Sequence, residues 1–476
     1  MLVLLGFAMI LTFMALIMTK RLTPMVALIL VPTIFGLLAG AGFGLGDMIL
    51  DAIGDLAPTA ALLMFAIIYF GLMIDVGLFD PLVRFILRVV GNDPAKVVLG
   101  TALLAAAVSL DGDGSTTFIV TTAALLPIYL RLGLNPVILT CVAGLANGTI
   151  NIVPWGGPTA RAAAALGLSP TDIFVPMVPS LLAGLAVVMV FAWILGLQER
   201  KRLGYLGLLE NGAGDLLSGQ GNNRSGGKRA GGSGTGSSSG ATGTATSLQT
   251  LVRADDTAMA DTVLDPDRDT LRPRLFWFNL GLTVIVMAML VADLVPLPYV
   301  FMVGGAIALL VNFPQLKAQG TAIVAHAPSI VGVVSMVLAA GVLIGVLNGT
   351  GMVTAMADWL VAIIPDTLGP YLAVITGLLS IPMTFFMSND AFYFGMLPIL
   401  TESAATFGID PLAMARASIT GQPVHLQSPL VPAILLLVSL ANVNLGDHHK
   451  KVLWRAAVVS LVMLLVGVLV GAIPWG

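Results

Sequence analysis

The sequence predicts an all-α polytopic membrane protein with two inverted repeats of five spans, each with a re-entrant hairpin and a broken (unwound) helix. Three observations indicate this fold class. Of the 476 residues, 57% are hydrophobic and only 10% are charged, whereas about 25% are charged in soluble domains. The two halves of the chain repeat one another. Polar stretches rich in glycine and proline interrupt apolar segments at matching places in both halves.

The first repeat occupies residues 1–197 and opens with an apolar run at residues 2–18. Lys20 and Arg21 follow this run and no A-x-A site ends it, so we interpret it as an uncleaved span rather than as a signal peptide. The rest of this half predicts spans at 24–44, 58–78 and 173–197, an amphipathic stretch at 80–90, a hairpin at 95–132 and a broken helix at 136–166.

The hairpin at 95–132 has two apolar arms, Ala95–Leu110 and Thr116–Leu130, joined by the polar sequence DGDGS. Both arms are shorter than the roughly 20 residues of a full span. A half-helix of about 15 residues rises roughly 22 Å, which passes the midplane of an apolar core roughly 30 Å thick. We therefore expect the tip to stop inside the membrane, surrounded by protein or by a water-filled cavity. The alternative is an ordinary loop between two short full spans.

The segment 136–166 contains GLANGTINIVPWGGPTARA and is expected to break. Three glycines and two prolines fall within residues 148–158, and one proline in a helix interior costs about 3 kcal/mol. The unwound part exposes backbone carbonyls. Pro158 suits the first position of a new half-helix, whose free N–H groups favour an anion.

Residues 198–272 are polar and rich in glycine and serine, which predicts a flexible cytoplasmic linker. The second repeat, residues 273–476, follows the first at a nearly constant distance. Gly133, Pro136, Pro154 and Asp172 have counterparts 275 residues later. The second half therefore predicts spans at 275–295, 298–313, 328–347 and 451–473, an amphipathic stretch at 352–364, a hairpin at 367–407 and a broken helix at 411–440.

The loop charges predict the orientation of the chain. Because each half has five spans, the second half must enter the membrane in the opposite direction. Basic residues then gather on one face, among them Arg84, Arg88, Arg131 and Arg200, while the alternate loops are acidic. The positive-inside rule places both termini outside and the linker in the cytoplasm. Inverted repeats with broken helices are typical of secondary transporters.

Two hairpin tips and two unwound helices are expected to meet in one midplane site, where polar groups are functional by default. The candidate substrate-binding residues are Ser115, Thr116, Asn147, Gly148, Thr149, Asn151, Gly156, Gly157, Thr159, Arg161, Ser388, Asn389, Gln422, Gln427 and Ser428. The candidates for proton coupling are Asp111, Asp113, Asp390 and His425, and those for metal binding are Asp113, Asn389 and Asp390.

Two of these residues have competing interpretations. Arg161 is a cation in the first turn of a half-helix and opposes the helix dipole. It therefore needs a countercharge, which is either a substrate carboxylate or a structural partner. His425 is the only histidine expected inside an apolar span. Since histidine titrates near neutral pH, it either carries a coupled proton or holds a structural hydrogen bond.

Four motifs in this order, DGDGSTTF, NIVPWGGPTARAA, MSNDAFYFG and GQPVHLQSPLVPA, resemble the citrate–divalent metal:proton symporter family (CitMHS) of the ion transporter superfamily. The resemblance covers both halves without the linker. It implies uptake of citrate complexed with a divalent metal such as Mg or Ca, coupled to protons. Dicarboxylate members of the superfamily bind sodium at Ser-Asn-Thr tips. Here the second tip reads Ser388-Asn389-Asp390, which argues against a purely sodium-coupled mechanism.

The expected function is therefore a symporter that imports a citrate–metal complex by alternating access through the cell (plasma) membrane. We expect lipid as its surroundings, a homodimer as one possible assembly, no resident cofactor, no nucleic-acid partner and no enzymatic activity. The alternative is a proton- or sodium-coupled carrier of another di- or tricarboxylate. An intramembrane aspartyl protease would need a G-x-G-D context, which LDGDG does not match, and a channel would not need two hairpins.

Overall fold

A computed structural model gives the fold and describes residues 1–476 except 20, 92, 113, 219–267, 293 and 366. All regular elements in this described part are helices. Seven of its helices are long and apolar enough to cross a membrane, namely Gly42–Asp75, Pro94–Asp111, Gly114–Leu132, Pro170–Gly204, Ala327–Gly349, Gly369–Phe386 and Leu445–Leu469. The all-α polytopic fold class is therefore confirmed.

The helices of the first half follow the order of the predicted segments. Its helices are α1 (Leu2–Met18), α2 (Pro24–Leu38), α3 (Leu45–Asp75), α4 (Asp80–Val90), α5 (Pro94–Val108), α6 (Gly114–Leu132), α7 (Pro136–Ile150), α8 (Gly157–Leu166), α9 (Pro170–Phe174) and α10 (Val178–Ser218). The helix break at 151–156 separates α7 from α8, as the glycines and prolines there predict.

The second half repeats this series. Its helices are α12 (Phe276–Ala292), α13 (Leu297–Asn312), α14 (Leu316–Ala325), α15 (Ala327–Gly349), α16 (Met352–Ile363), α17 (Leu372–Phe386), α18 (Leu397–Ala405), α19 (Pro411–Ser418), α20 (Gln422–His425), α21 (Pro432–Leu440) and α22 (Leu445–Leu469), with a π-helical turn at Ala391–Met396. Helices α1 and α12 begin and end 274 residues apart, and α7 and α8 begin 275 residues before α19 and α21. The duplication thus extends to the boundaries of the elements, while the inverted orientation stays a prediction.

Several helices begin with the same local device. A polar side chain accepts a hydrogen bond from a backbone N–H of the first turn, and proline follows it directly at the first helical position. The polar residues are Thr23, Asp93, Asn135 and Asp410. This arrangement is stable because the proline lacks an N–H that would otherwise need a partner, and the side chain satisfies the next one.

Some boundaries differ from the prediction. Helix α3 begins at Leu45. The acidic loop expected between the predicted spans 24–44 and 58–78, which holds Asp47, Asp51 and Asp55, is therefore helical. The reason is that Ala52 and Leu56 form a buried face at helical spacing. Helix α10 continues to Ser218, well past the predicted linker start at residue 198. Helix α22 begins at Leu445 rather than 451. His448 therefore also lies in an apolar helix. The prediction that His425 is the only histidine in such a helix is wrong.

The hairpin arms are longer than predicted. The segments Pro94–Asp111 and Gly114–Leu132 have 18 and 19 residues, and both are long and apolar enough to cross a membrane. The re-entrant interpretation of the hairpin therefore stays a prediction beside its alternative, a loop between two full spans.

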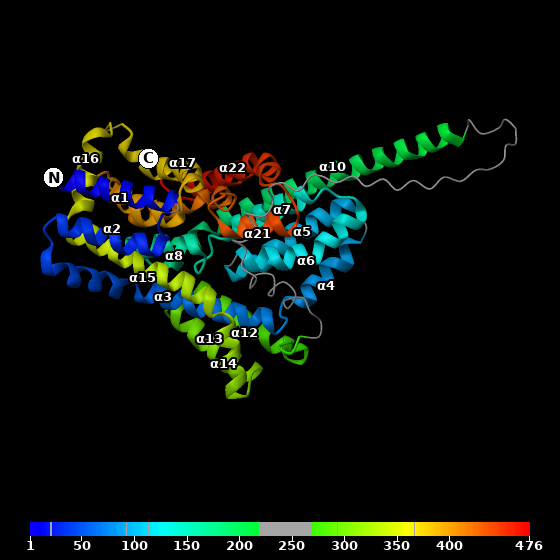
Figure 1. The fold of residues 1–476 in the computed structure, drawn as a ribbon, viewed down its shortest axis with the longest axis horizontal. Helices are drawn as coiled ribbons and strands as arrows, with labels where there is room; N and C mark the ends of the chain where they lie inside the picture. Colours follow the sequence, from blue (N-terminus) through cyan, green and yellow to red (C-terminus); the bar gives the residue numbers. More distant parts are fainter. Residues whose placement is uncertain (20, 92, 113, 219–267, 293, 366) are drawn as a thin grey trace, which may run out of the picture.

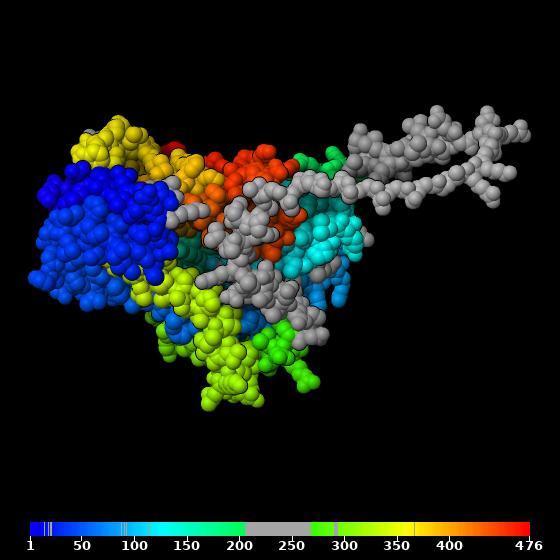
Figure 2. Space-filling model, viewed as in Figure 1, coloured from blue at the N-terminus to red at the C-terminus, as the bar shows by residue number. Residues whose placement is uncertain are grey.

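The two halves pack into each other rather than forming separate lobes. Helix α3 packs against its counterpart α15, and α10 packs against its counterpart α22. Helix α2 also packs on α15, and α13 packs on α3 in the same way. Figure 2 shows the result on one face, where segments of the first half (blue, cyan) alternate with segments of the second (yellow, red).

The broken helices join each half to the hairpin of the other. Half-helix α8 packs against the π-helical turn and α18, and half-helix α21 packs against α6. The two termini lie at one end of the ribbon, and α10 ends at the opposite end (Figure 1). Near the termini, Phe7 meets Trp359 with ring centroids 5.1 Å apart, and Tyr371 meets Trp475 at 6.2 Å.

Candidate functional site

The first hairpin tip is a tight turn held by α7. A 3-10 turn, Ser109–Asp111, ends the first arm, and Gly112 has a φ of 79°, which glycine adopts without strain. Asn147 Nδ2 donates to Ser109 Oγ at 2.9 Å. Thr117 Oγ1 lies 3.2 Å from the same Ser109 Oγ. These contacts anchor the tip to α7 through hydroxyl and amide groups.

The described residues that were predicted for this tip lie in the turn itself or at the start of α6. Asp111 is 7% exposed and belongs to the 3-10 turn. Ser115 and Thr116 lie in the first turn of α6. Asp113, a candidate for both proton and metal binding, lies outside the described residues. Trp155 from the helix break donates from Nε1 to the Leu110 carbonyl at 2.8 Å, which ties the break to the tip.

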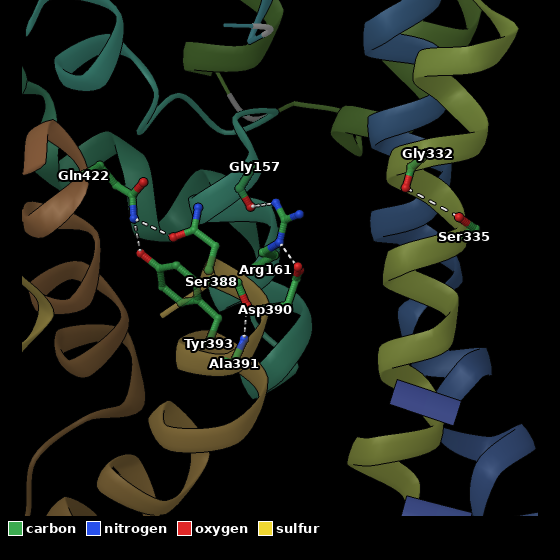
Figure 3. Close-up of polar contacts among 10 residues, drawn as sticks. Gly157, Arg161, Gly332, Ser335, Ser388, Asp390, Ala391, Tyr393 and Gln422 are labelled. Carbon is green, nitrogen blue, oxygen red and sulfur yellow. Dashed lines mark hydrogen bonds and ion pairs between the residues drawn. The ribbon is translucent and has the colours of Figure 1, made fainter. Parts of the chain in front are cut away.

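The second tip is held by α20 in a related way (Figure 3). Gln422 Nε2 donates to Asn389 Oδ1 at 3.2 Å and to Tyr393 Oη at 2.9 Å. Ser388 Oγ accepts from the Ala391 N–H at 3.2 Å and so caps the π-helical turn. Since Tyr393 follows Asn389 by four residues, the two side chains reach the same amide from one face of the turn.

Asn147 and Gln422 occupy equivalent positions, 275 residues apart. Each donates from its amide nitrogen to the hairpin tip of its own half. Each also keeps its carbonyl oxygen buried with no hydrogen-bond partner among the described residues. An unmade buried hydrogen bond costs about 1–3 kcal/mol, so these two oxygens at equivalent positions are acceptors that a ligand could use. An amide oxygen can accept from a hydroxyl or bind a hard cation.

The two broken helices cross beside these amides. A Cβ on Gly148 would lie 2.9 Å from Pro423 Cα and 3.3 Å from the Gln422 carbonyl oxygen. Only glycine therefore allows this close approach. A Cβ on Gly114, the first residue of α6, would lie 3.2 Å from Asn147 Oδ1 and from Ala433 Cβ. The first tip, α7 and the second half thus converge at one place.

Arg161 and Asp390 form an ion pair between the two halves (Figure 3). Arg161 Nε lies 2.6 Å from Asp390 Oδ1, and the two side chains are 17% and 10% exposed. Arg161 Nη1 also donates to the Gly157 carbonyl at 3.1 Å. The countercharge that the sequence required for Arg161 is therefore present in the protein itself, in the second hairpin tip.

The helix break before α8 is shaped by its own residues. A Cβ on Gly156 would lie 2.1 Å from the Asn151 carbonyl oxygen, so no other residue fits there. Thr159 Oγ1 donates to the Ile152 carbonyl at 2.7 Å and closes the turn. This geometry sets the direction in which α8 leaves the break, and hence the place of Arg161.

Four of the predicted residues have contacts to backbone carbonyls. Thr149 Oγ1 donates to the Leu145 carbonyl within its own helix, and Ser428 Oγ donates to the Phe385 carbonyl. His425 Nδ1 lies 2.5 Å from the Thr384 carbonyl oxygen. Gln427 Nε2 donates to the Gly144 and Pro423 carbonyls, and its Oε1 lies 3.1 Å from His448 Nε2. These contacts fix the broken helices to their neighbours.

Four residues at the tips lie outside the predicted set, namely Ser109, Thr117, Tyr393 and Trp155. The signal for the first three was their spacing from selected residues, because each lies within one or two helical turns of a hairpin tip. Nothing in the sequence indicated that Trp155 would reach the Leu110 carbonyl, since that contact depends on the path of the unwound chain.

Within the described ranges, no group of three or more His, Cys, Asp or Glu side chains could hold a metal ion. Of the three residues predicted to bind a metal, Asp113 lies outside the described residues. The structure places the other two, Asn389 and Asp390, in the second hairpin tip. The second tip therefore offers one carboxylate and several amide and hydroxyl oxygens. Such a set suits a metal that brings most of its ligands with it.

The model of the citrate transporter family, CitMHS, matches residues 3–421 of the chain. Two relatives from Bacillus subtilis (strain 168) align along its whole length. One, named "Citrate transporter", is 46% identical over 475 residues and covers 100% of both chains. The other, named "Mg(2+)/citrate complex secondary transporter", is 44% identical over 474 residues and covers 99% of both. Among solved structures, the YdaH transporter of Alcanivorax borkumensis aligns at TM-score 0.49 and 13% identity, over 89% of this chain and 87% of that one.

Proposed function

Because the chain belongs to the citrate transporter family, CitMHS, we propose that it imports citrate as a complex with a divalent metal ion. The import is coupled to protons and proceeds by alternating access across the cell membrane. The relative named for a Mg(2+)/citrate complex supports this substrate at 44% identity. Both termini lie outside, and the central linker lies in the cytoplasm.

The observation that carries this proposal is the Arg161–Asp390 ion pair. A citrate–metal complex presents both signs of charge, a carboxylate that suits Arg161 and a cation that suits Asp390. When the complex binds, each member of the pair exchanges its protein partner for a substrate partner of the same sign. No charge is therefore left buried and unpaired during this exchange. An unpaired buried charge would cost several kcal/mol.

The substrate's own charge favours the complex over free citrate. Citrate at neutral pH carries about three negative charges, and a divalent metal lowers this to about one, so the complex is far easier to desolvate. Free citrate also lacks a cation for Asp390. Asn147 Oδ1 and Gln422 Oε1, both buried without a described partner, accept from the citrate hydroxyl or complete the coordination of the metal.

Proton coupling follows from the same exchange. Once Arg161 has turned to a substrate carboxylate, Asp390 has lost its ion-pair partner and accepts the metal or a proton in its place. Asp111, 7% exposed in the first tip, is a second candidate for the proton. The alternative function is a carrier of another di- or tricarboxylate, driven by protons or sodium.

The test is uptake of labelled citrate into proteoliposomes with Mg, Ca, Ni, Zn or no divalent metal. We expect uptake with at least one metal, little uptake without any, and stimulation by an inwardly directed proton gradient. Equal uptake with EDTA would exclude the metal complex as the substrate. Uptake driven by a sodium gradient alone would support the alternative carrier.

A further inference from the structure

We propose that a basic pocket at the start of α22 binds the phosphate headgroup of an anionic phospholipid. The pocket has a volume of about 440 Å³ and lies between the beginnings of α7 and α22. Its lining residues are Asn135, Val137, Asp447, Lys450, Lys451, Trp454 and Arg455. None of them belongs to the hairpin tips, so the proposal is independent of the transported substrate.

The five lining residues from α22 form one face of its first three turns. Their spacing of three and four residues places the side chains next to one another along the helix. Three are cationic, and one, Asp447, is anionic, with its Oδ1 3.4 Å from Lys450 Nζ. Cations near a helix N-terminus oppose the dipole. An anion in the pocket would offset both that effect and the repulsion among the cations.

Arg455 points most directly to a ligand. It is only 7% exposed and lines the pocket. Its Nη1 donates to the Lys451 carbonyl, while its Nε is buried with no hydrogen-bond partner among the described residues. The guanidinium Cζ lies 4.2 Å from the centre of the Trp454 ring, which fixes its plane. A guanidinium held in this way keeps its Nε–H available to an acceptor, and phosphate oxygens are strong acceptors for arginine.

The surroundings indicate a lipid rather than a soluble phosphate. Trp454 is 52% exposed, and tryptophan prefers the headgroup level of a bilayer. Further along the same face of α22, Leu461 and Leu465 are 46% and 54% exposed. They continue from the pocket as an apolar path for an acyl chain. Basic pockets between membrane helices on the cytoplasmic side are suited to acidic headgroups. Lys450, Lys451 and Arg455 belong to the basic loop residues that the positive-inside rule places on that side.

The experiment measures thermal unfolding of delipidated full-length protein in detergent, with added phosphatidylglycerol or phosphatidylcholine. We expect phosphatidylglycerol to raise the Tm more than phosphatidylcholine does. The double variant Lys450→Gln/Lys451→Gln should lose at least half of this difference, and Arg455→Gln should lose more. The matched control is Arg84→Gln/Arg88→Gln, which also removes two exposed cations of the same predicted face and should keep the full difference.

Three outcomes would overturn the proposal. The first is an equal rise in Tm with both lipids in the wild type. The second is an equal loss in the control and in the lysine variant, which would indicate a general charge effect. The third is a rise in Tm with inorganic phosphate or glycerol 1-phosphate that is as large as the rise with phosphatidylglycerol. If Arg455→Gln fails to fold, the lysine variant still decides the question, together with a count of bound phosphatidylglycerol by native mass spectrometry.

Discussion

Arg161 and Asp390 distinguish the two halves of the site at the scale of single residues. At the shared spacing of 275 residues, Asp113-Gly114-Ser115 corresponds to Ser388-Asn389-Asp390, so serine and aspartate exchange places between the tips. Arg161 corresponds to Leu436, which carries no charge. The ion pair thus has no counterpart in the other half. The duplicated frame therefore gives one asymmetric site rather than two equal ones.

Because Arg161 and Asp390 form an ion pair, substitutions of the two residues should not have independent effects on the free energy of unfolding. Removal of one partner leaves a buried charge unpaired, so Arg161→Gln or Asp390→Asn alone should destabilise the protein by about 1–3 kcal/mol, less than the 3–5 kcal/mol of fully buried pairs. The double variant should lose clearly less than the sum of the two. Chemical unfolding in detergent measures all three. Strictly additive losses would show that the pair does not persist in solution.

Asp93 provides a pH-dependent contact outside the spanning segments. The Arg200 guanidinium donates to Asp93, with Nε 3.2 Å from Oδ1, and holds the pKa of that carboxyl below its usual range against a smaller opposing effect of burial. A depressed pKa stabilises the fold above the ordinary carboxyl pKa, and this contribution is lost as the pH falls through the lower folded value.

The Asp93→Asn substitution isolates this contribution. Asparagine still caps α5, so the variant loses only the charge. We expect a small fall in Tm at pH 7. This fall should shrink as the pH is lowered below about 4, where the carboxyl of the unfolded chain begins to take up a proton, and should vanish once the pH has passed through the lower pKa of the folded state. The check is the difference in Tm between wild type and variant as a function of pH. A difference that stays constant with pH would contradict this account.

The fold depends on breaks and crossings at the scale of helices. The order of the elements, the break at 151–156 and the start of α8 could be predicted from the sequence, because proline and glycine act locally. The helical state of the acidic stretch in α3 and the length of α10 could not. They depend on long-range packing and on marginal propensities. The Arg161–Asp390 contact was also beyond prediction, since it joins residues 229 positions apart.

The crossing of α7 and α20 should be sensitive to a single methyl group. Gly148→Ala places a Cβ 2.9 Å from Pro423 Cα, so the two broken helices must separate. We expect a loss of stability of about 1–3 kcal/mol and a fall in citrate uptake of at least about tenfold, roughly 1.4 kcal/mol. The matched control is Gly305→Ala in α13, where a Cβ would meet nothing within 4 Å.

The control should keep full uptake and unfold at the same temperature or slightly higher, because alanine favours a helix over glycine by roughly 0.5–1 kcal/mol. If Gly148→Ala transports as well as Gly305→Ala, the crossing does not position the site.

The whole molecule is expected to be an inverted duplication. The interleaved packing of α3 with α15 and of α10 with α22 is what two interlocked copies of one unit would produce. Sequence periodicity could predict the duplication, since prolines and glycines keep a constant spacing. It could not predict that equivalent helices pack against each other, because the spacing holds no information on contacts between the halves.

Sidedness tests the inverted arrangement. In a Cys141→Ala background, which removes the single cysteine, cysteines are placed at Arg88, Arg131, Asp358 or Glu402. All four positions are exposed. We expect membrane-impermeant thiol reagents to label the first two only from the cytoplasmic side and the last two only from outside. Labelling of all four from one side would contradict the topology and the shared site.

The central claim is that a citrate–metal complex binds between Arg161 and Asp390. Calorimetry of citrate binding to purified protein, with saturating Mg²⁺ or with EDTA, tests it most directly in wild type, Arg161→Gln and Asp390→Asn, with Asp358→Asn as the control on an exposed carboxylate. Wild type and control should bind citrate at least about tenfold more tightly with Mg²⁺, roughly 1.4 kcal/mol. Arg161→Gln should bind weakly in both conditions, and Asp390→Asn should lose the Mg²⁺ effect itself. If Asp390→Asn keeps the full Mg²⁺ effect and Arg161→Gln binds as tightly as wild type, the substrate does not bind between these two residues.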